Sequence, residues 1–220
     1  MNRSLRGALI LACAAWLVGC GDNVVGEPPA WYYTPRDAGE IDPDRDGGTP
    51  TYPVGPYGGE AGDVVENAAF AGYVTEMPVD SIRGNEYIES VTFEDLRDIE
   101  GYDYLLFNVA ADWCAECKLE AREFPNQYAD WAPRGGLLVS VVIEDTNARP
   151  ATKQVLDNWL RSQRPTYTTL HDPSAYVNRV LVPPTLPLNV VIDLETMTIL
   201  RTQVGTDPAV FDYFESLLER

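Results

Sequence analysis

Histidine and cysteine, from which most metal sites and disulfide frameworks are built, are scarce in this sequence. The 220 residues include one histidine, His171, and four cysteines. Two cysteines lie near the N-terminus, at Cys13 and Cys20, and the other two form a single C-x-x-C pair, Cys114 and Cys117. A zinc site needs four ligands and a small secreted domain needs several paired cysteines, so this spacing argues against both.

Positive charge is scarce as well. The chain has 16 Lys and Arg residues against 34 Asp and Glu residues, which gives a net charge of −18. So acidic a protein is repelled by nucleic-acid backbones and by anionic lipid surfaces, and we expect no nucleic-acid partner. The length suits one domain with appendages and is too short for two sizeable cores.

No apolar stretch near the N-terminus reaches the ~20 residues that a membrane-spanning helix needs. Residues 7–18 are apolar, follow Arg3 and Arg6, and end in Leu17-Val18-Gly19-Cys20. This layout resembles a bacterial lipoprotein signal peptide over residues 1–19, including its lipobox. The resemblance implies export, cleavage before Cys20, and a lipid on that thiol which holds the domain to a bacterial membrane in the periplasm or extracytoplasmic space. The alternatives are an uncleaved anchor and a cysteine that falls by chance in an ordinary signal peptide.

Residues 20–62 are rich in Pro, Gly and Asp and show no sustained period, which predicts a flexible acidic tether. Within it, the sequence Asp-Pro-Asp-Arg-Asp-Gly at residues 42–47 is similar to the opening of a calcium-binding loop. The acidic ligand at loop position twelve would fall on Pro53, which cannot bind calcium, so we interpret the segment as an acidic linker. The tyrosines of residues 52–58 indicate that this part of the tether lies against the domain.

Hydrophobic periodicity predicts an α/β domain over residues 63–220, with lead-in strands before a β-α-β-α-β-β-α core. Continuous apolar runs favour strands buried on both faces, and spacings of three and four favour amphipathic helices. The first short helix is expected to be capped by Thr92 and Asp95, and the last by Asp207-Pro208. The predicted strands are residues 69–75, 89–93, 104–110, 137–143, 188–192 and 198–204, and the predicted helices are residues 93–98, 117–131, 155–160 and 210–218.

The C-x-x-C pair falls between a buried strand and an amphipathic helix. Cys114 would therefore lie at a helix N-terminus, where free N–H groups and the helix dipole favour the thiolate that attacks disulfides. We expect Cys114 to be exposed to a partner disulfide. Cys117, one turn further along, would resolve the mixed disulfide. The alternatives are a zinc half-site and a purely structural disulfide.

The sequence at this junction is Asn108-Val109-Ala110-Ala111-Asp112-Trp113-Cys114-Ala115-Glu116-Cys117-Lys118-Leu119-Glu120. With these residues, the chain resembles the thioredoxin-like superfamily. The resemblance is to membrane-tethered extracytoplasmic thiol-disulfide oxidoreductases and their alkyl-hydroperoxide-reductase/thiol-specific-antioxidant-like relatives. It implies a thioredoxin-like fold with a central mixed β-sheet flanked by helices. It also implies a protein-disulfide oxidoreductase that needs no cofactor, acts on client proteins with disulfides and is served by an upstream electron donor.

The resemblance also assigns supporting residues around the motif. Trp113 precedes the pair, and Asn108 takes the place of the buried aspartate of cytoplasmic thioredoxins. Glu120 matches an acid typical of the tethered subfamily, and its offset of three from Cys117 would let it exchange a proton with that thiol. The equally open alternative for Glu120 is a solvated surface acid.

In that alternative, Lys118 or Arg122 would pair with the solvated carboxylate. Glu116 lies inside the motif, where its charge disfavours the Cys114 thiolate and so favours a reductant slightly.

The family fold also places a cis-proline opposite the disulfide. Residues 182–187 contain three prolines. The family spacing to Ile192-Asp193 selects Pro187, preceded by Leu186. Pro184 begins a Pro-Thr pair like that of the family but lies three residues too early.

Two other functions stay open as alternatives: a metal carrier or binding module on a thioredoxin fold, and a thiol peroxidase. A copper carrier could use His171 with the two cysteines, although copper-binding relatives usually have three residues between their cysteines. We interpret His171, beside Asp172-Pro173, as a solvated turn residue. A thiol peroxidase would need a Pro-x-x-x-Thr-x-x-Cys frame, which does not precede Cys114.

Overall fold

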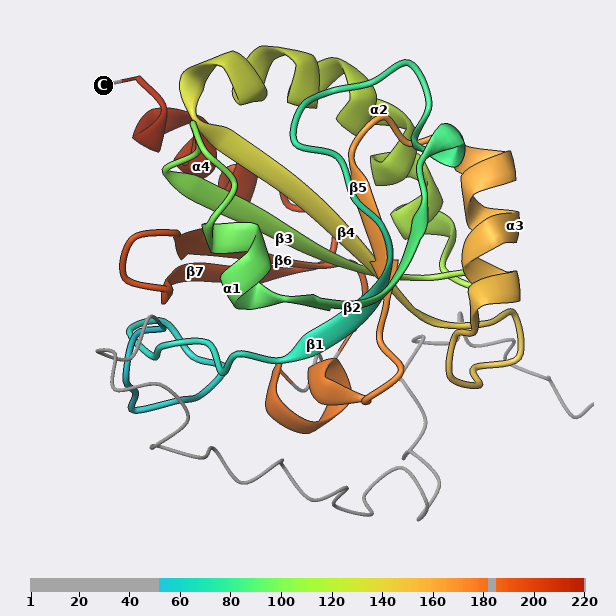
Figure 1. Ribbon diagram of the computed structural model, residues 1–220, viewed down its shortest axis with the longest axis horizontal. Helices are drawn as coiled ribbons and strands as arrows, with labels where there is room; N and C mark the ends of the chain where they lie inside the picture. The colour runs from blue at the N-terminus through green and yellow to red at the C-terminus, as the bar shows by residue number, and fades with distance from the viewer. Residues whose placement is uncertain (1–51, 182–184, 220) are drawn as a thin grey trace, which may run out of the picture.

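The computed structural model describes residues 52–181 and 185–219, which form a mixed seven-stranded sheet with helices packed around it (Figure 1). The strands are β1 Ala69–Tyr73, β2 Tyr87–Thr92, β3 Tyr104–Ala111, β4 Gly136–Glu144, β5 Thr168–His171, β6 Leu188–Asp193 and β7 Thr198–Val204. The α-helices are α1 Phe93–Arg97, α2 Ala115–Trp131, α3 Lys153–Gln163 and α4 Ala209–Leu217. The shorter helical turns are η2 Ile82–Gly84, η3 Ala132–Arg134 and the π-helical η4 Val177–Leu181.

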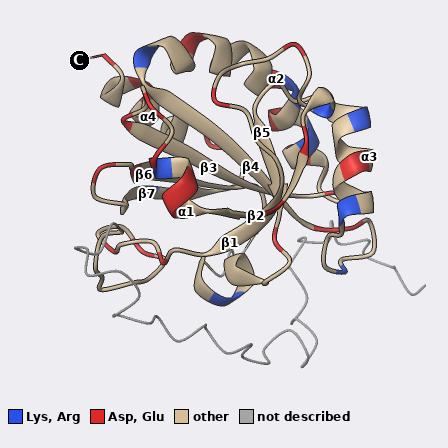
Figure 2. Ribbon diagram, in the orientation of Figure 1, with Lys and Arg blue, Asp and Glu red and all other residues tan. Residues whose placement is uncertain are grey.

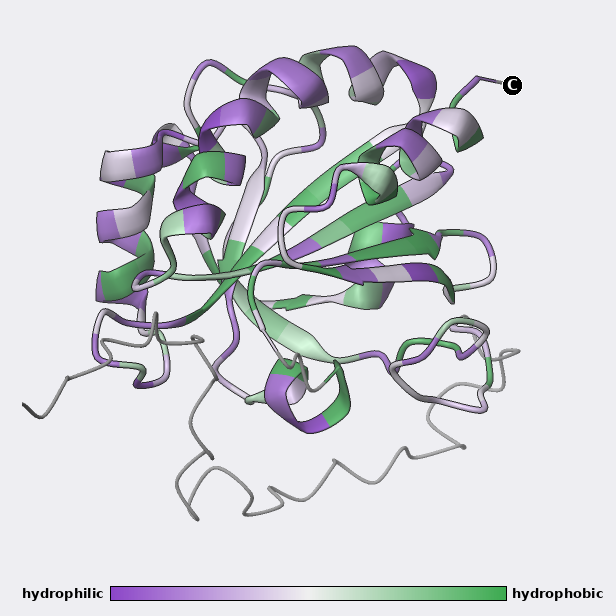
Figure 3. Cartoon of the chain, turned by 180° about the vertical axis from the view of Figure 1, so that it is seen from behind, coloured by the Kyte–Doolittle hydropathy of each residue, from purple (hydrophilic) through white to green (hydrophobic). Residues whose placement is uncertain are grey.

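The strand order in the sheet is β2-β1-β5-β4-β3-β6-β7. Strands β3, β4 and β5 run parallel, whereas the pairs at either side of them are antiparallel. Every residue of β3 and β4 is buried, as their continuous apolar sequences predict, and the strands are hydrophobic where they cross the centre of the domain (Figure 3). Charged residues lie mainly on helices and loops, and β3 carries none (Figure 2).

Two hydrophobic clusters cover the two faces of the sheet, because successive strand residues point to opposite sides. Leu106 of β3 belongs to a cluster with Phe124 of α2 and Phe214 of α4. Its neighbour Phe107 belongs to the other cluster, where its ring lies 5.1 Å from that of Phe93 in α1. Helix α2 therefore lies with α4 over one face of the sheet, which places the C-x-x-C pair at the edge where β3 ends.

The N-terminal part of the described chain packs against the domain. The Tyr52 hydroxyl donates to the Val65 carbonyl at 2.9 Å, as expected for a tyrosine that lies against the core. The same expectation is wrong for Tyr57, which is 49% exposed and donates to the Pro53 carbonyl within its own segment. Gly62 N and Ile199 O are 2.8 Å apart, so the segment before β1 also pairs with β7. The predicted signal peptide, Cys20 and residues 42–51 of the calcium-like sequence lie outside the described residues.

Thr92 and Asp95 form the expected capping box at α1, with both reciprocal hydrogen bonds present. The hairpin β6–β7 and the helix after Asp207-Pro208 are confirmed. The element order predicted for the core omits one strand, β5. This strand was missed because it is only four residues long and contains two threonines. This strand joins β4 to β1, so it connects the lead-in strands to the core.

Among the residues that the structure describes, no helix combines the length and the apolar character that crossing a membrane requires.

Candidate active site

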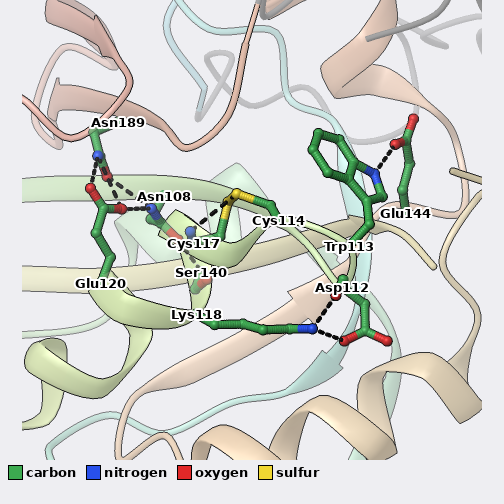
Figure 4. Close-up of a disulfide and its surroundings, with 10 residues drawn as sticks. All are labelled: Asn108, Asp112, Trp113, Cys114, Cys117, Lys118, Glu120, Ser140, Glu144 and Asn189. Atoms are coloured by element: carbon green, nitrogen blue, oxygen red, sulfur yellow. Dashed lines mark hydrogen bonds and ion pairs between the residues drawn. A yellow bond between two sulfur atoms is a disulfide. The ribbon is translucent and has the colours of Figure 1, made fainter. Parts of the chain in front are cut away.

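The two cysteines of the C-x-x-C pair form a disulfide at the N-terminus of α2, with their Cα atoms 5.3 Å apart (Figure 4). A turn after β3, in which Cys114 N donates to Ala111 O at 3.1 Å, begins the helix. Cys114 is the N-cap residue, and its Sγ accepts a hydrogen bond of 3.1 Å from Cys117 N. In the reduced protein the same position would stabilise a thiolate on Cys114, because the free N–H groups of the helix point toward it.

The expectation that Cys114 is exposed is wrong for this disulfide form. Cys114 is 3% exposed and Cys117 2% exposed. The N-cap position brings both side chains into the larger hydrophobic cluster, which also contains Leu186 of the segment before β6. In the disulfide form Cys114 is therefore largely covered by protein atoms.

Trp113 and its neighbour Asp112 are both held in place beside the disulfide. Trp113 Nε1 donates to the buried Glu144 carboxylate at 2.6 Å, and a bulge in the β3–β4 pairing sets Glu144 opposite Ala111 (Figure 4). Asp112 Oδ1 forms an ion pair of 3.1 Å with Lys118 Nζ of α2. These contacts fix the turn that carries Cys114 to both β4 and α2.

The Glu120 carboxylate is part of a buried polar network beneath α2 (Figure 4). Asn108 Nδ2 donates to Glu120 Oε2 at 3.1 Å, and Asn189 Nδ2 lies 3.2 and 3.4 Å from its two oxygens. Asn108 Nδ2 also donates to Asn189 Oδ1 at 2.9 Å, and Ser140 Oγ donates to Asn108 Oδ1 at 2.8 Å. Every polar atom of the two amides that these bonds involve therefore has a partner.

Three members of this network come from one row of the sheet. Asn108 pairs in register with Ser140 of β4 on one side and with Asn189 of β6 on the other. Sequence reasoning found Asn108 and Glu120 but missed Ser140, Asn189 and Glu144. The signal was present, because each of these is a polar residue within or at the end of an apolar strand sequence, where an unpartnered polar group is costly.

Burial is the main reason why the pKa of Glu120 is raised, to about 7. The hydrogen bonds from Asn189 and Asn108 oppose this rise, and the charge of Glu116 adds to it. The alternative of a solvated surface acid is wrong, since Glu120 is 9% exposed. Its two suggested partners are engaged elsewhere: Lys118 with Asp112, and Arg122 Nε with Gln163 Oε1.

The Leu186–Pro187 peptide bond is cis, at the proline that the family spacing selects. Leu186 is buried in the same hydrophobic cluster as Cys114 and Cys117. The two other candidates, Pro183 and Pro184, lie outside the described residues.

The prediction that His171 is a solvated turn residue is wrong. It is the last residue of β5 and is 6% exposed. Its Nε2 lies 2.8 Å from the Tyr87 hydroxyl and its Nδ1 lies 3.2 Å from the Ala151 carbonyl, so both ring nitrogens have partners. Residues 52–181 and 185–219 contain no group of three or more His, Cys, Asp or Glu side chains placed to hold a metal ion.

Solved structures with the same fold include several redox proteins. A chain described as a thiol:disulfide interchange protein, DsbE, from Chlorobium tepidum is 17% identical over 72% of this chain and 97% of its own, with a TM-score of 0.54. The thioredoxin domain of a thiol-disulfide oxidoreductase from Bacteroides vulgatus is 16% identical over 74% and 99%, with a TM-score of 0.50. The reduced 2-Cys peroxiredoxin of Plasmodium vivax is 13% identical over 71% and 81%, with a TM-score of 0.54. At these identities the likeness shows the thioredoxin-like fold.

A search of curated protein sequences returned no match. The family model described as AhpC/TSA matches residues 76–199, which include the disulfide, the buried network and the cis-proline. With more than half of its length matched, the chain belongs to the AhpC/TSA family of thioredoxin-like proteins.

Proposed function

We propose that this protein is a protein-disulfide oxidoreductase that works through Cys114 and Cys117. The observation that carries the proposal is the pairing of a disulfide at a helix N-terminus with a buried carboxyl group, Glu120, on the same helix face. The first feature supplies a reactive thiolate, and the second supplies a group whose pKa of about 7 lets it take up or release a proton near neutral pH.

The reduced protein begins a cycle with a thiolate on Cys114. This thiolate attacks one sulfur of a client disulfide, so that a mixed disulfide forms and the other client sulfur leaves as a thiolate. Cys117 then gives up its proton and attacks the Cys114 sulfur. The bond between Cys114 and the client breaks, the second client thiolate leaves, and the Cys114–Cys117 disulfide forms. The client gains two electrons, and an upstream dithiol donor must return two electrons to the enzyme.

Glu120 is the proton acceptor that we assign to the second step. It follows Cys117 by three residues, so the two side chains project from the same side of α2. The carboxylate takes the Cys117 proton and passes it on to the departing client thiolate or to solvent. When the enzyme is reduced again, the proton returns to Cys117 by the same route.

A thiol peroxidase is the second candidate, because the family model that matches is named for peroxide-linked members as well. The two activities separate in one experiment on the purified protein. Wild type, Cys114→Ser and Cys117→Ser are compared for dithiothreitol-driven reduction of insulin and for consumption of hydrogen peroxide. We expect wild type alone to accelerate insulin reduction, with no peroxide consumption above the dithiothreitol background. Rapid peroxide consumption that requires Cys114 would support the peroxidase instead.

We further propose that the protein is exported and anchored through lipid at Cys20, with its clients and its electron donor outside the cytoplasm. The support for this is the lipobox resemblance at residues 17–20 and the acidic tether that follows it. A copper carrier has no comparable support, because both ring nitrogens of His171 are occupied by Tyr87 and Ala151.

A further inference from the structure

Asn189 is in an unusual position for a side-chain amide, in the middle of the most buried part of the sheet. It is 0% exposed, and β6 is otherwise apolar from Leu188 to Ile192. A buried amide is costly unless its donors and acceptor are used. Its Oδ1 accepts from Asn108, and its Nδ2 approaches both oxygens of Glu120, so the donor side of this amide serves the carboxylate.

The hydrogen-bond directions in this network all favour a negative charge on Glu120. Ser140 donates to the carbonyl oxygen of Asn108, and Asn108 in turn donates to the carbonyl oxygen of Asn189. Each amide therefore presents its NH₂ group to the carboxylate. Hydrogen bonds donated to a carboxylate stabilise its ionised form and lower its pKa.

We propose that Asn189 is a positioning residue for the dithiol chemistry, which holds the Glu120 carboxyl group against the sheet and keeps its ionised form accessible. The proposal rests on the proposed function, because it matters for turnover only if Glu120 accepts the proton of Cys117. A buried base that stayed protonated at neutral pH could not accept a proton. Asn189 thus offsets part of the cost of burying the carboxylate in the place where the reaction needs it.

Other titratable groups around Glu120 act on the same equilibrium. Glu116 and Cys117 lie on the same helix as Glu120, and Tyr167, which precedes β5, interacts electrostatically with the Glu120 carboxylate. Glu116 opposes ionisation of Glu120. Asn189 and Asn108, from β6 and β3, are the groups that favour it.

The test is a direct titration of Glu120 in the purified full-length chain. The protein is labelled with ¹³C at the glutamate carboxyl carbons and kept in the disulfide form, so that neither Cys114 nor Cys117 titrates. The Glu120 resonance is the one that Glu120→Gln removes. Asn189→Leu keeps the side-chain size and removes both N–H donors of the amide. Asn189→Ala also removes both donors, without adding apolar bulk.

The matched control is Thr169→Val. Thr169 pairs in register with Ser140, is equally buried, and donates its hydroxyl to Tyr167 O, outside the network. Valine has the same shape as threonine, so this variant removes a buried hydroxyl from the same row of the sheet without touching Glu120.

We expect both Asn189 variants to move the Glu120 midpoint upward by about one pH unit or more, since a lost hydrogen bond to a charged group is of that size. Thr169→Val should leave the midpoint unchanged. In the insulin assay, Asn189→Leu should be slow at pH 7 and recover as the pH rises, whereas Glu120→Gln should stay slow.

An unchanged midpoint in the Asn189 variants, or an equal shift in Thr169→Val, would overturn the positioning role. The titration uses no substrate, so it succeeds or fails independently of turnover. If Glu120→Gln turns over like wild type, the proton-transfer role in the proposed function fails, whatever the midpoints show.

Discussion

Glu120 and Cys117 lie three residues apart on the buried side of α2, where Glu120 is 9% exposed and Cys117 2% exposed. A carboxyl group at this position has little water to serve as its proton partner. Under the proposed function, the Cys117 thiol is the proton partner of this carboxyl group.

Replacing Glu120 by glutamine should slow disulfide exchange while the fold and the Cys114–Cys117 disulfide are kept. Removal of a positioned proton-transfer group typically costs ~10²-fold in rate. The pKa of the Cys117 thiol should also fall, because an ionised carboxylate raises the pKa of a nearby thiol. Insulin reduction and iodoacetamide alkylation of the reduced protein across pH measure the two effects. Wild-type behaviour in both would leave Glu120 without a catalytic role.

The raised pKa of Glu120 makes a second prediction, for stability. The folded protein binds this proton up to about pH 7, whereas the unfolded chain releases it near pH 4.5. Stability should therefore fall as the pH rises between these values, by about 3 kcal/mol for this group alone. Urea unfolding of oxidised wild type and Glu120→Gln from pH 4.5 to 8 isolates the effect, because the other acids are common to both. Two parallel curves of unfolding free energy against pH would contradict the burial cost.

His171 should behave in the opposite way. Burial lowers its pKa, and the Tyr87 hydroxyl donates to its Nε2 while its Nδ1 faces the Ala151 carbonyl. The folded protein therefore takes up this proton at a lower pH than the unfolded chain. The stability that neutral His171 contributes is present above about pH 6.5 and is lost as the pH falls through the folded pKa.

The proton NMR signal of His171 is easy to assign, since the chain has one histidine. Its midpoint should lie below 6.5 in wild type and rise in Tyr87→Phe, which loses the donor to Nε2. A wild-type midpoint at or above 6.5 would contradict burial as the dominant influence on the pKa of His171.

Lipid attachment makes a prediction for Cys20. Wild type expressed in a bacterium should fractionate with membranes, and its mature N-terminal peptide should carry lipid on Cys20. Cys20→Ser should accumulate as unprocessed or soluble protein, because the thiol that receives the lipid is gone. Cys13→Ser is the matched control and should still be processed. Mass spectrometry that finds an unmodified Cys20 inside a longer peptide would refute the anchor.

Much of the fold could be predicted from local patterns. The apolar runs of β3 and β4 and the Thr92–Asp95 capping box depend on neighbouring residues alone, and all three are present. Strand β5 could not be predicted, because four residues with two threonines carry too little periodicity. Its stability comes from pairing with β4 and β1, which are distant in sequence.

The residues of the candidate site also fall into those that the local sequence predicts and those that it does not. The cysteines, Asn108 and Glu120 lie within one continuous segment, so the family resemblance of that segment relates them. Asn189 reaches Glu120 only because β6 pairs with β3 in one particular register, and a single sequence does not specify that register. The burial of Cys114 was missed for the same reason, since the hydrophobic cluster that contains it draws side chains from distant segments.

The most direct test of the proposed chemistry is to trap its mixed disulfide. In Cys117→Ala the intermediate between Cys114 and a client cannot be resolved, so it should accumulate and be seen as a covalent complex on a non-reducing gel and by mass spectrometry. Cys114→Ala should trap none, because the attacking sulfur is missing. Equal trapping by both variants, or by neither, would contradict the assignment of Cys114 as the nucleophile and Cys117 as the resolving thiol.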